Sequence, residues 1–435
     1  MANGRFRGKA EGWLLDQRQL KTTPSRLYIW FCTLFYLIEN NFYKIIKLDG
    51  TLQKYLLLGL SLAAFVLFFA DAGLFGTAKR ASRFMQRVLL PGVVFFLLAE
   101  FLYARVHYGQ GVSDFLAASY HYCYLFLSPM LLYIFDRQGG FRPLMDRLTT
   151  LVCVGLALSI LNTLIYNVSG VMLLEVSYRL RDESLRTYGL SSVLGIECVY
   201  TFWRLMKGHS KKGQLIEAAI VAVSIVYCYR TRMMEISMAV IAVYLFLRRS
   251  KSSGRRVIAA LAVMFGVVLA AFFGLFDRVL DSFAVGGAHS GSTSTRLNEI
   301  AYYLEELRQS PVFGIGLLAT RTTLGFYRVR GPLGRYSITD VGLIGSTGLM
   351  GVPYLILTGV FLLRGLYILR HLRNTRIKDY PAAVLLETLM VYIISTLPTL
   401  IITDSGRMFG LVIVTALFEY VYAREKGRAP ERGRA

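Results

Sequence analysis

Two arginines lie in a tight turn between apolar stretches, where the fold of the chain does not require positive charge. The turn Tyr229-Arg230-Thr231-Arg232 joins two short apolar stretches, and the charge distribution described below places this turn on the outer face. A hairpin tip needs only polar residues, and positive charge is disfavoured outside. We therefore interpret Arg230 and Arg232 as part of a binding site, with Glu235 as the partner of Arg232.

A second group of arginines follows in a stretch that lacks acidic residues. Residues 310–339 contain Arg321, Arg328, Arg330 and Arg335 but no Asp or Glu. Guanidinium groups bind phosphate oxygens in pairs, so this stretch predicts a positive surface for an anionic ligand such as phosphate. Arg179, Arg181, Arg186 and the segment Asp404-Ser405-Gly406-Arg407 could complete a ring of charge around it.

The polar stretch from His289 to Gly316 predicts the helix that covers this site. Apolar residues recur at spacings of three and four, which is typical of one helix face, and Arg296 and Glu299 share the opposite face. Ser294 or Thr295 can cap the start and Pro311 cannot continue a helix, which predicts a helix over about residues 296–310. The apolar positions are Leu297, Ile300, Leu304 and Leu307. A helix that merely lies at the membrane interface is the alternative.

The rest of the chain is far too apolar for a soluble protein. Of its 435 residues, 55% are hydrophobic, and the mean hydropathy is +0.49. Twelve stretches are long enough, or nearly so, to cross a hydrocarbon layer, for which about 20 residues suffice. They are residues 27–44, 55–74, 87–105, 114–135, 147–167, 188–206, 213–229, 233–247, 257–276, 340–363, 381–403 and 408–423. We therefore predict an all-α, polytopic membrane helical bundle.

Most of the 49 Lys and Arg residues lie in segments that share one side when the N-terminus is inside. This bias predicts that both termini are cytoplasmic, and the first span has no cleavage pattern of a signal peptide. Residues 1–276 would hold nine spans, 277–339 the long outer loop, and 340–435 the last three spans and the C-terminal tail.

Several chemistries find no support in the sequence. All five cysteines lie in apolar stretches, which indicates neither disulfides nor a metal site. No motif for nucleotide or catalytic zinc binding is present, so we expect no cofactor, no metal and no nucleic acid partner. The acids within spans, Glu100, Glu217, Glu387 and Glu419, show no proton-relay spacing and are interpreted as interhelical or cytoplasmic, while Asp114 and His121 are ambiguous.

Three pieces of sequence lie between about residues 186 and 365. The first is the pair of short spans interrupted by Arg230-Thr231-Arg232. The second runs from Ser294-Thr295-Arg296 through the helix to Pro311-Val312-Phe313-Gly314-Ile315-Gly316. The third is Asp340-Val341-Gly342-Leu343-Ile344-Gly345, with Gly348 and Gly351. Together these pieces resemble the O-antigen ligase and O-antigen polymerase family of bacterial membrane glycosyltransferases.

The resemblance implies a GT-C-like bundle in the bacterial plasma membrane that transfers a glycan from a polyprenyl diphosphate to a sugar hydroxyl, without a metal. The acceptor would also be lipid-linked, and a chain-length regulator is a possible partner. Arg230, Arg232 and Arg296 would hold the diphosphate, with Arg321 as a further ligand and Arg186 and Arg407 as additional candidates. Ligases typically carry a His where this chain has Asp340, which favours a repeat-unit polymerase over a ligase.

The residues themselves suit this chemistry. Arginines in a partly dry site can stabilise a diphosphate leaving group, and the sugar hydroxyl must lose its proton to a base. Asp340 or Glu299 could be that base, and His289 is a third candidate. If Asp340 is the base, Asp340→Asn would cut transfer about a hundredfold or more, whereas a mere helix cap would tolerate that change.

A transporter or flippase of lipid-linked oligosaccharides is the competing class. Such proteins often consist of two related halves, and no halves are evident in this sequence. A purely structural scaffold would leave the outer arginines unexplained.

The predicted topology can be tested by cysteine labelling. In a cysteine-free variant, a single cysteine at Ser292 should react with a membrane-impermeant reagent in intact cells, whereas one at Ser252 should not. Labelling at Ser252 alone would reverse the predicted orientation.

Overall fold

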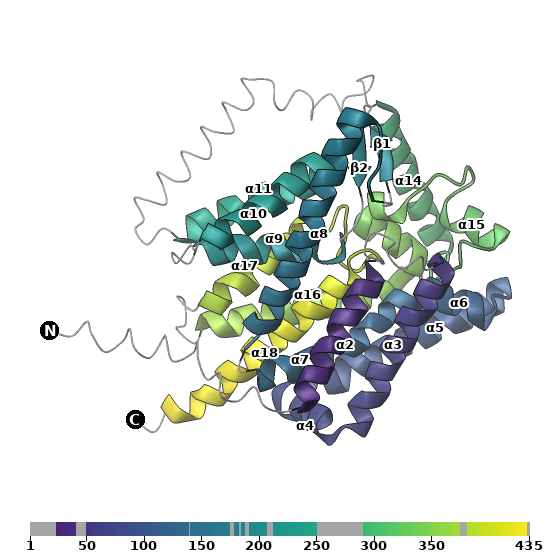
Figure 1. The fold of residues 1–435 in the computed structure, drawn as a ribbon. Helices are drawn as coiled ribbons and strands as arrows, with labels where there is room; N and C mark the ends of the chain where they lie inside the picture. Colours follow the sequence, from purple (N-terminus) through teal and green to yellow (C-terminus); the bar gives the residue numbers. More distant parts are fainter. Residues whose placement is uncertain are drawn as a thin grey trace.

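The computed structural model describes residues 23–40, 49–138, 140–174, 178–181, 184–187, 191–206, 212–249, 290–374 and 381–432. Most of these residues are helical, as predicted, and the strands within the described ranges form one two-stranded antiparallel hairpin (Figure 1). The first half contains α2 (Thr23–Glu39), α3 (Gly50–Ala70), α4 (Ala72–Ala81), the π-helix η3 (Met85–Leu89), α5 (Leu90–Tyr108), α6 (Val112–Ser119), the 3₁₀ helix η4 (Tyr120–Leu127), α7 (Ser128–Arg137), α8 (Arg142–Ser169), β1 (Tyr178–Arg181), β2 (Ser184–Thr187) and α9 (Ser191–Met206). The second half contains α10 (Lys212–Val223), the π-helix η5 (Ser224–Tyr229), α11 (Arg232–Arg249), α14 (Ser290–Gln309), α15 (Thr323–Val329), the 3₁₀ helix η6 (Ile338–Asp340), α16 (Gly342–Asn374), α17 (Pro381–Ser395) and α18 (Met408–Arg432).

Six helical stretches among the described residues are long and apolar enough to cross a membrane. They are Gly50–Ala70, Met85–Tyr108, Val112–Arg137, Arg142–Ser169, Lys212–Tyr229 and Gly342–Asn374. The other predicted spans coincide with α2, α9, α11, α17 and α18, which are shorter or more polar, and span 257–276 lies outside the described residues. The chain is therefore an all-α polytopic membrane protein.

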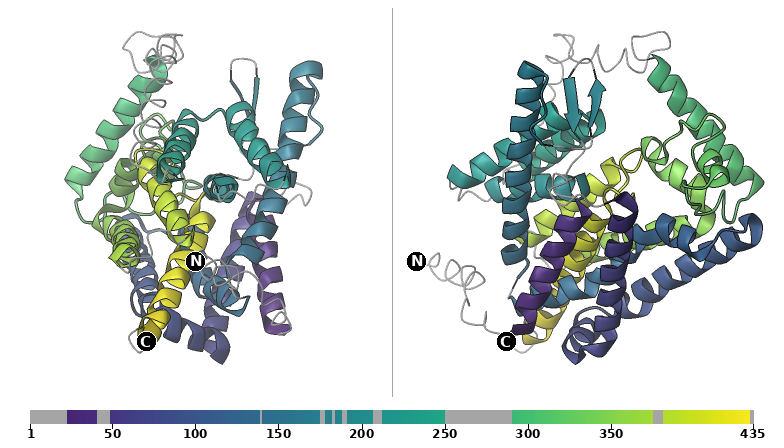
Figure 2. Two further views of the ribbon diagram at one scale, coloured as in Figure 1. Left: turned by 90° about the vertical axis from the view of Figure 1, so that its left-hand side faces the viewer. Right: turned by 45° about the vertical axis from the view of Figure 1, so that its right-hand side comes forward.

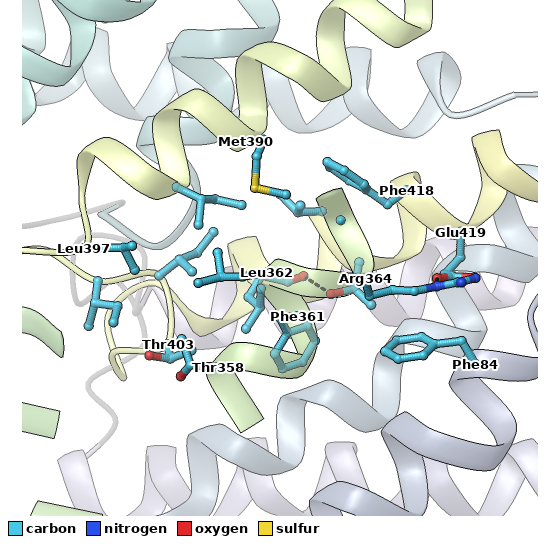
Figure 3. Close-up of a pocket in the computed structure, with 17 residues that line it drawn as sticks. Phe84, Thr358, Phe361, Leu362, Arg364, Met390, Leu397, Thr403, Phe418 and Glu419 are labelled. Carbon is cyan, nitrogen blue, oxygen red and sulfur yellow. Dashed lines mark hydrogen bonds and ion pairs between the residues drawn. The ribbon is translucent and has the colours of Figure 1, made fainter. Parts of the chain in front are cut away.

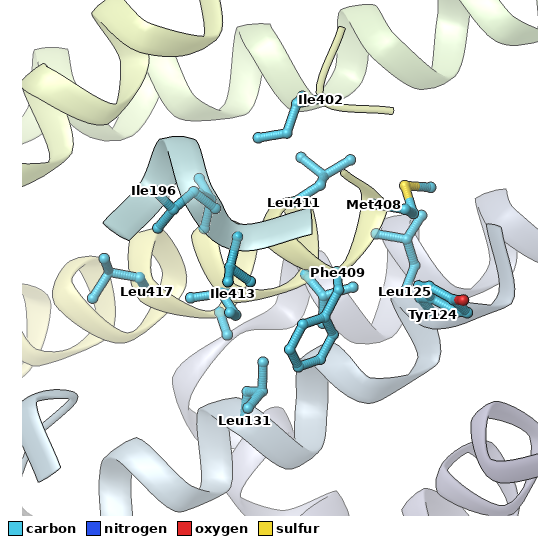
Figure 4. Packing of buried hydrophobic residues seen from close by; sticks show 14 of the residues in the cluster. Tyr124, Leu125, Leu131, Ile196, Ile402, Met408, Phe409, Leu411, Ile413 and Leu417 are labelled. Atoms are coloured by element: carbon cyan, nitrogen blue, oxygen red, sulfur yellow. The ribbon is translucent and has the colours of Figure 1, made fainter. Parts of the chain in front are cut away.

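Helices α16, α17 and α18 lie between two groups of helices (Figures 1 and 2). Helix α18 packs against η4 and α7 on one side and against α9 on the other, and α17 packs against α9 and α11. Figure 4 shows Phe409 and Ile413 of α18 between Leu131 of α7 and Ile196 of α9, and all four side chains are buried. Burial of α18 on both sides makes it the axis of the bundle.

The acids within the predicted spans have structural partners, as expected. Glu419 forms an ion pair with Arg364 at 2.6 Å and accepts a hydrogen bond from Ser82 at 2.7 Å. This pair closes one end of an apolar cavity of about 560 Å³, open side included, between α16, α17 and α18 (Figure 3). Glu217 and Glu387 pair with arginines in the same way.

The outer loop and the C-terminus lie at opposite ends of the molecule. The start of α14 and the β1–β2 hairpin are at one end in every view, and the end of α18 is at the other (Figures 1 and 2). This arrangement is consistent with the predicted topology, although which end faces the cytoplasm stays a prediction.

The buried face of α14 is centred on Glu299 and Tyr303 rather than on the predicted apolar positions. Leu297 and Leu304 are 59% and 49% exposed, whereas Glu299 and Tyr303 are buried. Gly348 of α16 leaves room for Tyr303, since a Cβ there would lie 2.5 Å from the Cβ of Tyr303. The helix also begins earlier than predicted, at Ser290.

Helix α16 is broken near its outer end. Gly351 has φ 59° and ψ −145°, which lie outside the helical region and are accessible to glycine. Pro353 lacks an N–H, so the carbonyl of Leu349 has no donor one turn along the helix. The break therefore leaves backbone groups that need partners from elsewhere.

The segment that follows α14 supplies these partners. Residues 312–316 run alongside the break and form three backbone hydrogen bonds with it. Backbone groups of each segment are therefore satisfied by the other segment. The bonds are Val352 N–H to Val312 O at 2.8 Å, Ile315 N–H to Gly348 O at 3.1 Å, and Gly316 N–H to Leu349 O at 2.7 Å.

Gly351→Ala should destabilise the protein strongly. A Cβ at Gly351 would lie 2.1 Å from the carbonyl oxygen of Val312, and backbone strain adds to this clash, so we expect a loss of at least about 3 kcal/mol. Thermal unfolding in detergent measures the change. Gly359→Ala on the same helix is the control, because a Cβ there meets nothing within 4 Å. Equal melting temperatures for the two variants would contradict the proposed importance of this junction.

Candidate functional site

Glu299 is a buried carboxyl group with one oxygen unpaired. It lies on α14 in the outer loop, is 1% exposed, and accepts a hydrogen bond from the backbone N–H of Ser337 at 3.0 Å through Oε1. Its Oε2 is buried and has no hydrogen-bond partner among the described residues. A buried carboxyl oxygen in this state lacks the partner that buried polar atoms normally have, and it can hold a proton.

Burial raises the pKa of Glu299 to about 7, because desolvation disfavours the charged form. The hydrogen bond from Ser337 opposes this effect, the charge of Asp340 raises the pKa further, and Arg296 lowers it. Glu299 can therefore change its protonation state near neutral pH, as a general base or acid must.

Asp340 is exposed at the end of η6. Its carboxylate forms no hydrogen bond within the described ranges, and it does not cap α16, which begins at Gly342. Instead the start of α16 is held by the bond from Leu343 N–H to Leu397 O at 2.9 Å. The predicted alternative of a capping role is therefore wrong, and the effect of Asp340 on Glu299 is electrostatic.

Arg296 precedes Glu299 by one helical turn. Its side chain is partly exposed, and its guanidinium forms no hydrogen bond or ion pair with a described residue. The structure thus brings Arg296, Glu299 and Asp340 together, on α14 and at the entry to α16.

The turn between α10–η5 and α11 is as tight as predicted. Only Arg230 and Thr231 lie between η5 and α11, and Arg230 adopts φ 48° and ψ 40°, a left-handed conformation that is uncommon outside glycine. Arg230 is partly buried. The side chain of Arg232 is outside the described part, so its pairing with Glu235 stays a prediction.

Arg186 lies against this turn rather than in open solvent. It donates from Nε to the carbonyl of Tyr229 at 2.6 Å and from Nη2 to the hydroxyl of Thr231 at 2.7 Å. Arg186 thus lies beside the turn that carries Arg230. This turn is at the same end of the molecule as α14 (Figure 1).

Two other predicted ligands are engaged elsewhere. Arg321 forms an ion pair with Asp114 and donates to Ser113 at 2.8 Å, which fastens the loop to α6. Arg407 pairs with Asp404 at 2.6 Å. His289 lies outside the described residues. The candidate site therefore rests on Arg230, Arg296, Glu299 and Asp340, with Arg232 as predicted from the sequence.

Sequence reasoning missed the tyrosines that fix α14. Tyr303 is fully buried and donates to the carbonyl of Val329 at 2.7 Å, and Tyr302 donates to that of Arg328 at 2.8 Å. Tyr302 also packs on Tyr336 with ring centroids 5.4 Å apart. The spacing of four between Glu299 and Tyr303 was a usable signal, since it places both on one helix face.

Comparison with known proteins gives a family match to part of the chain. A family model described as O-antigen ligase (Wzy_C) matches residues 218–342, which include the turn at Arg230, all of α14 and Asp340. A search of curated proteins gave no match. The chain is thus a multi-pass membrane protein whose residues 218–342 match the O-antigen ligase (Wzy_C) family model, consistent with a role in O-antigen-related glycan transfer.

Proposed function

We propose that this protein is a polymerase of polyprenyl-diphosphate-linked oligosaccharide repeat units that acts on the outer face of the plasma membrane. The observation that carries the proposal is Glu299, a buried carboxyl with a spare oxygen beside Arg296 and Asp340, inside the family segment. A base next to a guanidinium is the pairing that glycan transfer from a diphosphate requires.

In the proposed step, the oxygen of an acceptor sugar hydroxyl forms a bond to the anomeric carbon of the donor glycan. The bond between that carbon and the diphosphate oxygen breaks, and the diphosphate leaves with the bonding electrons. The hydroxyl proton passes to Oε2 of Glu299. Arg230, Arg232 and Arg296 stabilise the charge that develops on the leaving diphosphate, because bidentate guanidiniums match its oxygens.

Of the two carboxylates, Glu299 is the better base. Asp340 is exposed, whereas Glu299 is buried and its pKa of about 7 suits proton transfer at neutral pH. We assign Asp340 the role of raising that pKa. Ligases of the family typically have a His in the place of Asp340, and this difference supports polymerisation over ligation to a lipid core.

Glu299→Gln should lower the rate of transfer by a factor of about a hundred or more, the range for a lost general base. In the wild type, the rate should rise with pH up to about 7 and then level off, because only the deprotonated carboxylate accepts a proton. The variant should lose this dependence. Glu305→Gln is the matched control, since Glu305 is on the same helix but is exposed and paired with Arg308.

Asp340→Asn distinguishes the role of Asp340 from that of Glu299. If Asp340 only raises the pKa of Glu299, the variant stays active and its pH profile shifts to lower pH. A hundredfold loss of rate in Asp340→Asn, together with an active Glu299→Gln variant, would make Asp340 the base and refute the assignment of Glu299.

Arg230, Arg232 and Arg296 should each be needed for donor use. Replacement of any of them by Ala should abolish polymer formation at normal protein levels, and Lys should restore little because it cannot bind bidentately. Arg308→Ala is the control on α14, because Arg308 is 81% exposed. Polymer length on a gel and donor KM are the measurements. Full activity of all three Ala variants would remove the diphosphate site from the proposal.

A further inference from the structure

The turn that contains Arg230 is held in place by the β1–β2 hairpin. Arg186 of β2 bonds to Tyr229 and Thr231, the residues on either side of Arg230, at 2.6 and 2.7 Å. Arg230 itself caps the π-helix through its N–H, which donates to the carbonyl of Ile225 at 3.0 Å. A left-handed arginine is strained, so the contacts on both sides are what keep the turn in this conformation.

Arg186 is in turn fixed by its surroundings. Strand β2 pairs with β1, so that Arg186 lies opposite Arg179 in the hairpin. Asn167, in the last turn of α8, accepts a hydrogen bond from the N–H of Leu185 at 3.4 Å and donates to the hydroxyl of Tyr227 at 2.9 Å. The side chain of Asn167 therefore joins the hairpin to η5, two residues before Tyr229.

These contacts use the geometry of a guanidinium. Nε and Nη2 of Arg186 reach two acceptors on opposite sides of one residue, and the single ammonium group of lysine cannot reproduce this fork. Both nitrogens are committed to the turn, so they are not available to a diphosphate in this arrangement.

We propose that Arg186 is a positioning residue: with Asn167 it braces the turn Tyr229–Arg232 and so presents Arg230 for binding of the donor diphosphate. The contacts of Arg186 and Asn167 with the turn and the hairpin are observed in the structure. Only the link between this brace and the donor rests on the proposed function. This role replaces the sequence-based expectation that Arg186 contacts the diphosphate itself.

Limited trypsin digestion tests the brace independently of activity. Trypsin cleaves after Arg230 and Arg232, and cleavage requires local opening of the turn. In full-length protein in nanodiscs, Arg186→Lys and Asn167→Ala should each speed cleavage after Arg230, Arg186→Lys by about tenfold, as followed by mass spectrometry. Ser169→Ala is the control, because Ser169 is in the same turn of α8 and its hydrogen bonds within the described residues are to Ile165 and Val171.

Donor kinetics separate a positioning role from direct binding. Both variants should raise the donor KM, and the double variant should be no worse than Arg186→Lys alone, because both remove the same brace. Unchanged cleavage after Arg230 in both single variants would overturn the proposal, as would additive effects on KM, which indicate an independent contact with the donor. If no variant or wild-type protein transfers glycan, the proposed function fails while the cleavage result still decides the brace.

Discussion

The position of α14 depends on the backbone pairing between residues 312–316 and the break in α16. Gly351 and Pro353 interrupt the helix, and the three hydrogen bonds from the loop satisfy the groups that the interruption exposes. An unpaired backbone group within a membrane protein costs several kcal/mol, on the order of the total stability of many domains, so neither segment can hold this conformation alone. The end of α14 is thereby fixed against α16.

Helix α5 supports the same segment from the other side. The ring of Tyr103 stacks on Phe313 at 4.6 Å, Glu100 accepts a hydrogen bond from the N–H of Leu317, and Gln110 bonds to Leu317 and to Ala319. A polar loop is therefore anchored to membrane-spanning helices by buried polar side chains. The position of Glu299 follows from this anchoring, because α14 ends where the anchored segment begins.

Much of the fold could be predicted from the sequence. Apolar stretches of sufficient length correspond to helices, since the bilayer requires that backbone groups bond within each segment. Pro311 correctly predicts the end of α14, and the short apolar pair correctly predicts the turn at Arg230. These features follow from local constraints, which a single sequence contains.

The orientation of α14 could not be predicted in the same way. Periodicity identifies an apolar face, but in a membrane protein such a face need not point to the protein interior. Glu299 accepts a hydrogen bond from Ser337, 38 residues later, and Arg321 pairs with Asp114, 207 residues earlier. Long-range partners of this kind leave no trace in local spacing.

The most direct test of the account is glycan elongation by the purified protein in the absence of any ion gradient. The reaction would contain only the protein and a lipid-diphosphate oligosaccharide, with products separated by length. A ladder of products, each longer by one repeat unit, is the predicted result, because the donor also serves as acceptor. Absence of elongation, with transport of the same lipid in sealed vesicles or transfer only to an added lipid core, would contradict the assignment as a polymerase.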